Sequence, residues 1–280
     1  MMKDKKLTNG RLMPQPGFGT FLTPDGEICV NSVRTAIEKG YNHVDTAAVY
    51  GNEKSVGEGI RESGKQREEI FLTSKLWNTE RGYDTTLRAF EKTISDLGTD
   101  YLDLYLIHWP ANRKQFGDKA DQLNIDTWRA FERLYEEGCI KSIGVSNFMP
   151  HHLEPLLEVA NVMPMVDQIE YHPGFMQPEA VNYCQQKGIV VQAWSPLGRG
   201  SILFDELLTG LAEKYGHTVA QTVIRWVMQH DIVPLVKSVT PSRIEENLQV
   251  FDFQISEEDM ALIDKMSSSR VGSDPDEATF

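Results

Sequence analysis

The stretch Leu102-Asp103-Leu104-Tyr105-Leu106-Ile107-His108 is an almost continuous run of strand-forming residues that ends in an ionisable side chain. A strand this apolar is typical of a parallel sheet whose two faces are both covered. Other short β-rich runs, several of them equally apolar, recur along the chain, at 16–20, 42–45, 70–75, 140–146, 165–170, 189–195 and 232–237. The sequence therefore predicts eight strands.

Amphipathic helical patterns separate these strands. One helix is expected over 30–39, Asp84 is expected to cap another, and Pro178 suits the first turn of a third. Eight strands alternating with helices predict an α/β fold, a (β/α)8 TIM barrel, built as a single domain over 1–280. An open, doubly wound sheet is the alternative. A dinucleotide-binding sheet of that kind would carry a Gly-x-Gly-x-x-Gly turn after its first strand, and this chain has none.

Two segments fall outside the eight repeating units. Residues 7–13 contain Asn9-Gly10, which predicts an N-terminal β-hairpin with a type I′ turn at the bottom of the barrel. Ser256, with Asp259 three residues later, predicts the start of an extra C-terminal helix that runs through Lys265. The polar tail over 267–280 is expected either to fold over one face or to stay loose.

The overall composition limits the choice of function. The 280 residues carry a net charge of −13, which disfavours binding to nucleic acid or to anionic membranes. Cys29, Cys139 and Cys184 show no metal-site or disulfide spacing, and His151-His152 lacks a metalloprotease pattern, so no metal is expected. With no long apolar run and no signal peptide, we expect a cytoplasmic protein, acting as a monomer on small molecules.

Polar side chains stand at or just beyond the ends of the predicted strands. In a barrel the carboxyl ends of the strands converge on one face, where the loops build the active site. Charges at such buried ends are costly unless they pair with each other or with a ligand. We therefore expect one site that contains Asp45, Lys75, His108, Asn147, Gln168, Ser195 and Lys237.

Five blocks of sequence, in order, resemble the aldo-keto reductase family. The first is His43-Val44-Asp45-Thr46-Ala47-Ala48-Val49-Tyr50-Gly51-Asn52-Glu53. The others are Thr-Ser-Lys-Leu-Trp at 73–77, Leu-Ile-His-Trp-Pro at 106–110, Gly-Val-Ser-Asn-Phe at 144–148, and residues 237–247. The resemblance extends over nearly the whole chain. It is strongest to bacterial reductases of the diketogluconate and methylglyoxal type.

The resemblance implies a catalytic tetrad of Asp45, Tyr50, Lys75 and His108. Hydride added to a carbonyl carbon requires a proton at the oxygen, and Tyr50 would supply it as general acid. An ammonium group nearby favours phenolate, so Lys75 is expected to lower the pKa of Tyr50. Asp45 would pair with Lys75, and His108 would hydrogen-bond the carbonyl oxygen. The implied reaction is reduction of aldehydes or ketones to alcohols.

The implied cofactor is NADPH. Lys237, Ser238 and Arg243 flank a predicted helix start at Thr240, a place that favours the extra phosphate of NADPH over NADH. Ser146, Asn147 and Gln168 resemble the family's carboxamide-binding residues, and Trp194 stands where many members stack a Tyr on the nicotinamide. The full predicted cofactor set is Thr20, Asp45, Ser146, Asn147, Gln168, Trp194, Ser195, Leu197, Lys237, Ser238, Val239, Thr240, Arg243, Glu246 and Asn247.

Aromatic residues are expected to form the substrate pocket. Trp77 and Trp109 resemble the family's pocket aromatics, and with Phe21 and His108 they would surround the tetrad. Several steroid-handling relatives have Tyr where this chain has Phe21, which disfavours a steroid substrate. The resemblance implies small carbonyls such as 2-oxoaldehydes or keto-sugars as substrates. The polar segment 112–124 is expected to form a mobile loop over the pocket.

Two other functions fit parts of the sequence. A barrel hydrolase would use a pair of carboxylates, and Asp103, Asp167 and Glu170 lie near strands. A binding module could keep the cofactor site and lack turnover. The Lys–Tyr set has no part in the hydrolase mechanism, and an intact tetrad disfavours the binding module.

Overall fold

The computed structural model describes residues 4–280 and confirms the barrel. Residues 1–3 lie outside the described range. The predictions of a single domain over 1–280 and of no signal peptide include these residues, and for them they stay predictions. Eight strands close in the order β10-β3-β4-β5-β6-β7-β8-β9, and every neighbouring pair is parallel. The open-sheet alternative is therefore wrong. The strands are β3 (Gly17–Gly19), β4 (His43–Asp45), β5 (Phe71–Leu76), β6 (Leu104–Ile107), β7 (Ile143–Ser146), β8 (Val166–Glu170), β9 (Val190–Trp194) and β10 (Val233–Val236).

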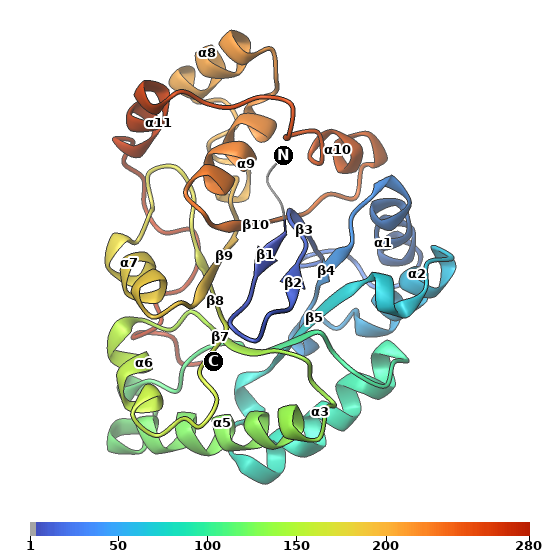
Figure 1. Ribbon diagram of the computed structural model, residues 1–280, viewed down its shortest axis with the longest axis vertical. Coiled ribbons are helices and arrows are strands. Elements are labelled where there is room, and N and C mark those ends of the chain that lie inside the picture. Colours follow the sequence, from blue (N-terminus) through green and yellow to red (C-terminus); the bar gives the residue numbers. More distant parts are fainter. Residues whose placement is uncertain (1–3) are drawn as a thin grey trace.

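Helices surround the barrel, and Figure 1 shows them as an outer ring around the strands. They bury one face against the strands because their apolar residues recur at helical spacing. Their bounds are α1 (Glu27–Lys39), α2 (Glu53–Glu62), α3 (Tyr83–Leu97), α4 (Arg113–Phe116), α5 (Ala120–Glu136), α6 (Pro150–Leu157), α7 (Pro178–Gln186), α8 (Glu206–Tyr215), α9 (Val219–Gln229), α10 (Pro241–Glu246) and α11 (Glu257–Asp264). The predicted extra C-terminal helix is α11, and its N-cap is Ser256, whose hydroxyl accepts from the Asp259 backbone N–H at 3.2 Å.

Three local predictions need correction. The first helix begins at Glu27 rather than at residue 30. Asp84 is not an N-cap, because α3 already begins at Tyr83, after Gly82. Segment 112–124 is not a loose loop: it forms α4, a 3-10 turn and the start of α5. Its aromatic residue, Phe116, packs beneath the Arg81 guanidinium, whose Cζ lies 5.2 Å from the ring centroid.

The predicted hairpin exists, but its turn differs from the prediction. Strands β1 (Lys5–Lys6) and β2 (Leu12–Met13) pair antiparallel and cross the middle of the ring in Figure 1. Only Gly10, with φ of 85°, is left-handed, whereas a type I′ turn would require Asn9 to be left-handed too. The Asn9 side chain instead donates to the Lys141 carbonyl at 2.9 Å. Asn9 thus fastens the hairpin to the bottom of the barrel.

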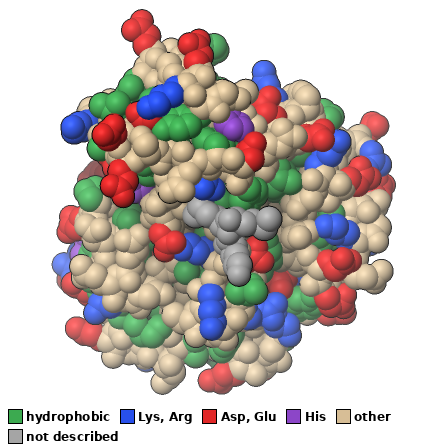
Figure 2. All heavy atoms as spheres, turned by 45° about the horizontal axis from the view of Figure 1, so that its top comes forward, with side chains coloured by type: hydrophobic (Ala, Val, Ile, Leu, Met, Phe, Trp, Pro, Cys, Tyr) green, Lys and Arg blue, Asp and Glu red, His purple; other side chains and the backbone are tan. Residues whose placement is uncertain are grey.

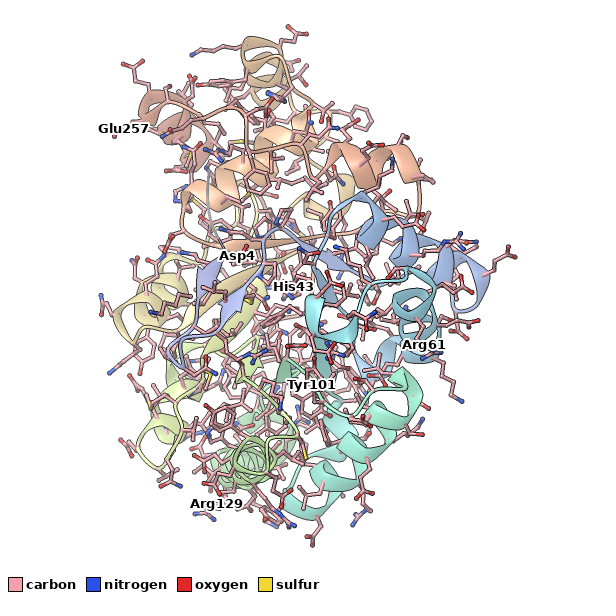
Figure 3. The ribbon with its side chains drawn as sticks, turned by 45° about the vertical axis from the view of Figure 1, so that its right-hand side comes forward. Asp4, His43, Arg61, Tyr101, Arg129 and Glu257 are labelled. Carbon is pink, nitrogen blue, oxygen red and sulfur yellow. The ribbon has the colours of Figure 1, made fainter. Side chains whose placement is uncertain are left out.

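A buried polar layer fills the lower part of the barrel. His43 donates from Nδ1 to the Pro14 carbonyl at 3.0 Å, and its Nε2 lies 3.1 Å from the Thr73 hydroxyl. Figure 3 shows His43 in the middle of the molecule beside the hairpin, while Arg61 and Arg129 lie on outer helices. Burial lowers the pKa of His43, so the imidazole is neutral at physiological pH. The interior is a packed core rather than a pore.

The surface is strongly charged but mixed. In Figure 2 acidic and basic side chains are scattered over the face shown, so the net charge of −13 is spread out there rather than gathered in one patch. Across residues 4–280, the helices are all too short or too polar to traverse a bilayer.

Candidate active site

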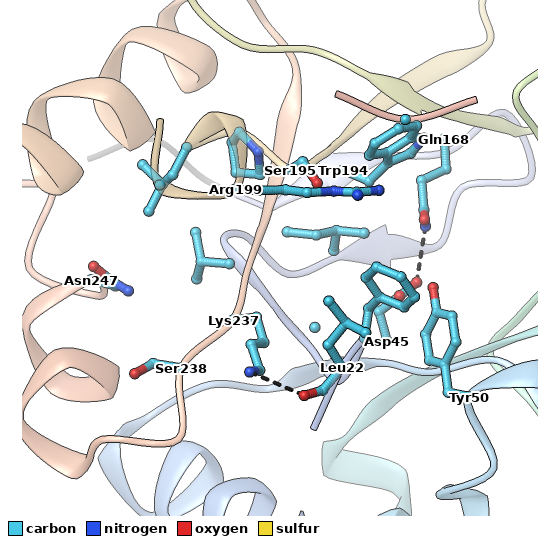
Figure 4. Close-up of a pocket in the computed structure, with 18 of the residues that line it drawn as sticks. Leu22, Asp45, Tyr50, Gln168, Trp194, Ser195, Arg199, Lys237, Ser238 and Asn247 are labelled. Atoms are coloured by element: carbon cyan, nitrogen blue, oxygen red, sulfur yellow. Dashed lines mark hydrogen bonds between the residues drawn. The ribbon is translucent and has the colours of Figure 1, made fainter. Parts of the chain in front are cut away.

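One large cavity opens at the carboxyl ends of the strands, the face where a barrel builds its site. Its volume is about 1010 Å³, and Figure 4 shows part of its wall. Most of the site residues predicted from the sequence line it, which confirms that they lie together. Four do not: Thr20 and Lys75 are buried behind the wall, and Val239 and Thr240 lie beyond its rim.

Asp45 and Lys75 form a buried ion pair beneath the cavity. They stand on the neighbouring strands β4 and β5, and their side chains are 4% and 0% exposed. The Lys75 ammonium donates to Asp45 Oδ1 at 2.6 Å and to the Thr46 carbonyl at 2.8 Å. Burial alone would lower the pKa of Lys75, but Asp45, and then Tyr50, outweigh it and raise that pKa. The ammonium is therefore charged at neutral pH.

Tyr50 lies between this pair and the cavity. It ends the 3-10 turn Ala48–Tyr50 after β4, and its hydroxyl accepts from the Lys75 ammonium at 3.4 Å. Lys75 lowers the pKa of Tyr50, as expected, but burial raises that pKa by more, so the net shift is upward. The phenol is thus protonated at neutral pH, and because its oxygen accepts from Lys75, its own hydrogen is free to point elsewhere.

His108 follows β6 at the same level of the barrel. Its ring centroid lies 5.7 Å from that of Tyr50 and 5.3 Å from that of Trp77. Burial, assisted by the Lys75 charge, lowers the pKa of His108 well below its usual value, so the imidazole is neutral. Its buried Nδ1 has no hydrogen-bond partner among the described residues. Because Nδ1 is buried, Nε2 is the ring nitrogen left to meet a ligand oxygen in the cavity.

A connected set of amides lines the wall next to Asp45. Gln168 donates to Asp45 Oδ2 at 2.9 Å, and the Ser146 hydroxyl donates to the Gln168 carbonyl at 2.7 Å. Asn147 donates from Nδ2 to the His108 carbonyl at 2.9 Å and accepts the Trp194 indole N–H at 2.8 Å. These bonds fix the side chains in place before any ligand arrives.

The far end of the cavity is lined by cations. Lys237 and Arg243 line it, in a protein whose net charge is −13. Arg199 also lines the cavity, but its guanidinium carbon lies 5.7 Å from the Phe21 ring centroid, toward the near end. Among residues 4–280, the Lys237 ammonium reaches the Leu22 carbonyl alone, at 3.4 Å. Helix α10 has only six residues, so its dipole is small. The positive side chains, rather than the start of this helix, would therefore attract an anion. Glu246 accepts from the Thr218 hydroxyl at 2.9 Å and lines the same end with Asn247.

Aromatic rings line the near end. Trp77 and Trp109 line the cavity as predicted, and both contact Phe280, at centroid distances of 5.4 Å and 5.2 Å. Phe21 packs against Tyr50 at 5.1 Å on the opposite side. An apolar slot therefore surrounds the phenol of Tyr50. The segment 112–124, expected to cover this pocket, does not line it.

The C-terminal tail is the main feature that sequence reasoning missed. Of the two predicted alternatives, it folds over one face, the barrel mouth, rather than staying loose. It thereby brings Gly272, Ser273 and Phe280 into the cavity wall. His151 and His152 each direct Nε2 at Asp276 Oδ1, at 2.8 Å and 3.1 Å. His152 Nδ1 accepts from the Met149 N–H, so in the neutral ring Nε2 carries the hydrogen and donates to Asp276. The histidine pair therefore ties the tail to the barrel through Asp276.

Other residues that sequence reasoning missed line the cavity. Arg199 follows β9, and a positive side chain just after a strand end in an acidic protein could have been predicted from the sequence to lie in the site. Leu22, Leu203 and Phe204 also line the cavity but carry no signal in the sequence. Exposed apolar side chains on loops cannot be assigned to a site until the loops are placed.

Strained backbone gathers around this cavity. Among the described residues, Leu22, Asn147, Ser195 and Arg199 have φ between 51° and 64°, and all four line the wall. Residues other than glycine adopt this region only when their surroundings impose it, and such positions cluster at functional sites. The backbone geometry therefore supports the same site as the side chains.

A comparison with known protein families shows which family this chain belongs to. The model of the Aldo/keto reductase family matches residues 17–268. The chain belongs to the aldo/keto reductase family. It is accordingly an NAD(P)H-dependent oxidoreductase, as the sequence predicted. The match spans all eight strands of the barrel.

Curated and solved relatives agree with this assignment. The chain is 51% identical to a glyoxal reductase of Bacillus subtilis (98% of this chain, 97% of the relative) and 48% identical to a 9,11-endoperoxide prostaglandin H2 reductase of Trypanosoma cruzi (96% and 94%). A crystal structure of a Gox0644 mutant in complex with NADPH has a TM-score of 0.92 at 41% identity, covering 100% of both chains. The first two relatives are named as reductases, and the third shares the fold of this chain.

The hydrolase alternative fails on geometry. Asp103 pairs with Arg11 and Arg67, at 2.8 Å and 2.9 Å, near the start of β6 rather than at the mouth. Asp167 points toward α7, where the Cys184 thiol lies 3.7 Å away. The Glu170 carboxylate accepts hydrogen bonds from two N–H groups of the C-terminal tail. Within residues 4–280, none of these three carboxylates lines the cavity.

Proposed function

We propose that this aldo-keto reductase uses NADPH to reduce small aldehydes and ketones, such as 2-oxoaldehydes or keto-sugars, with Tyr50 as the general acid. One observation carries the proposal. The Lys75 ammonium lies 2.6 Å from Asp45 Oδ1 and 3.4 Å from the Tyr50 hydroxyl, directly below the aromatic slot. This places a protonated phenol against a fixed positive charge at the point where a carbonyl oxygen can reach it.

Tyr50 gives its proton to the carbonyl oxygen. Its oxygen already accepts from Lys75, so the phenol hydrogen is directed into the cavity. Because Lys75 stays charged beside Asp45, it stabilises the phenolate that remains after the proton leaves. General acid catalysis of this kind contributes roughly 10²–10⁴ in rate. Asp45 is a positioning residue, because it touches Lys75 and Gln168 rather than the substrate.

His108 orients the substrate. Its ring is neutral and faces the same space as Tyr50, so it can hold the carbonyl oxygen by donating one hydrogen bond. A neutral donor does not compete with Tyr50 for the proton. The Asn147 side chain holds the backbone of His108 from behind, at 2.9 Å, and so limits its movement.

NADPH fits the remainder of the cavity. When bound, its reduced nicotinamide supplies the hydride for the carbonyl carbon. Ser146, Asn147 and Gln168 would hold the carboxamide, and Trp194 would stack on the ring, with Ser195 and Leu197 along the path. Thr20, buried behind the wall, would support the path without touching the cofactor. Lys237, Ser238, Val239, Thr240 and Arg243 would hold the ribose phosphate, and Glu246 and Asn247 the adenine. NADPH and NADP are also named for solved relatives, the latter in a Bombyx mori aldo-keto reductase.

The near end of the cavity favours small substrates. Trp77 and Trp109 both contact Phe280 there, so three aromatic rings line this end of the cavity. Similarity to a glyoxal reductase supports the same substrate class. A 2-oxoaldehyde presents a flat, activated carbonyl that enters such a slot without displacing a ring.

A substrate panel tests the proposal. Oxidation of NADPH would be followed with glyoxal, methylglyoxal, a keto-sugar, an aromatic aldehyde and a bulky ketone, and scored by kcat/KM. We expect the 2-oxoaldehydes to lead and the bulky ketone to trail. NADPH binding without turnover of any carbonyl would support the binding-module alternative. A panel led by the bulky ketone would refute the substrate class and leave the general acid in place.

A further inference from the structure

The tail is anchored beside the residue that would stack on the cofactor. Glu170 and Trp194 stand opposite each other in the β8–β9 ladder. The Glu170 carboxylate is buried and accepts two tail N–H groups, from Val271 at 2.6 Å and from Gly272 at 3.0 Å. A charged acceptor makes such bonds strong. The tail is therefore tied down at the strand end that holds Trp194.

Gly272 lies directly on the Trp194 indole. A Cβ added to Gly272 would lie 2.2 Å from Trp194 Cη2 and 3.1 Å from Cζ3. No real Cβ contact is that short, so any larger residue would force the ring to move. The φ of Gly272 lies outside the left-handed region, so its backbone conformation is open to alanine. The glycine is needed here for space.

The other edge of the same indole points at the polar wall. Its N–H donates to Asn147 Oδ1 at 2.8 Å, and Asn147 Nδ2 donates to Ser146 at 3.1 Å. Figure 4 shows Trp194 over the cavity, with a segment of the C-terminal chain passing above it. The ring is thus fixed at two edges, by Asn147 on one side and by the tail on the other. A shift imposed at Gly272 is transmitted to Asn147.

We propose that the C-terminal tail, through Gly272, is a positioning element for the cofactor: it sets the plane of the Trp194 indole and thereby the affinity for the nicotinamide half of NADPH. This inference rests on the proposed role of Trp194. It assigns to the tail an effect on the cofactor, in addition to the part that Phe280 takes in the substrate slot. Gly272 is a positioning residue, because it acts through Trp194.

Gly272→Ala tests the contact. The dissociation constant of NADPH would be measured by energy transfer from tryptophan to the bound cofactor, with thermal unfolding measured alongside. We expect the constant to rise about tenfold, since overpacking of a fixed ring is costly and must be relieved by moving it. Gly210→Ala is the matched control, because nothing lies within 4 Å of its added Cβ. The control should bind NADPH as the wild type does.

The same substitution in a Trp194→Phe chain distinguishes an effect through the Trp194 ring from general damage to the tail. Phenylalanine lacks the outer indole atoms that Gly272 contacts, so in a Trp194→Phe chain the added methyl group of Gly272→Ala loses its clash with the ring and keeps only its 3.1 Å approach to Glu170 Oε2. We expect Trp194→Phe/Gly272→Ala to bind NADPH as Trp194→Phe alone does. If the double variant loses a further tenfold, the tail acts by another route and the inference is wrong.

A readout without cofactor tests the inference separately from the proposed function. The emission of Trp194, obtained as the difference between each chain and its Trp194→Phe counterpart, should change in Gly272→Ala with no ligand present. Unchanged emission together with unchanged NADPH affinity would overturn the inference and leave the proposed function standing. Failure of the wild type to bind NADPH would instead refute the proposed function, whatever the emission shows.

Discussion

The two ends of the cavity hold their lysines in opposite ways. Lys75 is fully buried, and each of its three N–H groups has an acceptor, in Asp45, Thr46 and Tyr50. Lys237 is exposed and reaches one carbonyl at 3.4 Å, and Arg243 has no ion-pair partner within residues 4–280. The catalytic end is complete before a ligand binds, because a buried charge must be paired. The cofactor end keeps its cations free for an anion that the protein does not supply.

The largest expected effect breaks the catalytic end without touching the cofactor end. Tyr50→Phe removes the proton donor and keeps the ring. We expect kcat to fall by about 10²–10⁴, with the dissociation constant of NADPH within about twofold of wild type. Steady-state turnover and cofactor titration measure the two quantities. Near wild-type turnover would show that another group is the acid.

Lys75→Met sharpens the contrast in stability. It leaves the Asp45 carboxylate buried without its partner, which should cost about 3–5 kcal/mol in the free energy of unfolding. The matched control is Lys237→Met at the exposed end, which should change stability by less than about 0.5 kcal/mol. Asp45→Asn/Lys75→Met should recover most of the loss. Denaturant unfolding of all three variants measures these free energies. If Lys75→Met and Lys237→Met lost equal stability, the proposed difference between the buried and the exposed lysine would be wrong.

Arg243→Ala acts at the cofactor end alone. We expect the KM for NADPH to rise about tenfold, and that for NADH to change much less, because only NADPH carries the extra phosphate. Stability should stay at the wild-type level because the side chain is exposed. Initial rates with both cofactors measure the effect. A similar rise in KM for NADH would exclude recognition of that phosphate by Arg243.

The smallest effect is in the pH dependence of stability. Burial holds the folded-state pKa of His108 well below that of the unfolded chain, which is about 6.5. As pH falls below that value the unfolded chain takes up a proton that the folded chain refuses. The contribution of His108 is thus complete above this pH and is lost as pH falls, by about 1 kcal/mol per pH unit.

A variant isolates this contribution from other groups. Glu53, whose pKa burial raises to about 7, acts with the opposite sign, and it remains in both chains being compared. The slope of unfolding free energy against pH should therefore be lower in His108→Gln than in the wild type, by up to about 1 kcal/mol per pH unit between about pH 6.5 and 5. Urea unfolding at several pH values measures the slopes. Parallel slopes would mean that His108 is charged in the folded protein.

The periodic parts of the fold were predictable, and the irregular parts were not. Continuous apolar runs such as 102–108 predicted the barrel strands, since burial on both faces leaves a clear pattern. The tail was left open because residues 267–280 have no periodicity, and their place depends on Glu170, His151 and His152, far away in sequence. The turn at Asn9 was wrong because the Asn side chain bonds to Lys141 instead of remaining local.

The site divides in the same way. Asp45, Lys75, His108 and Gln168 could be placed together because strand ends converge, a rule that needs no contacts. Gly272 and Phe280 could not, because their roles depend on which rings they meet. That burial outweighs Lys75 in setting the pKa of Tyr50 could not be predicted either, since burial is a property of the folded chain. The monomeric state and the cytoplasmic location stay predictions.

The hairpin under the barrel has a consequence for proton supply. Met13 is fully buried there and its sulfur accepts from Gln192, which in turn meets Gln168, the neighbour of Asp45. Water is thus kept from the carboxylate–ammonium pair on that side. Under the proposed function, the mouth is the remaining route for replacing a proton lost by Tyr50, and it is also the route by which the alcohol would depart. Recharging of the acid and escape of the product would then share one passage.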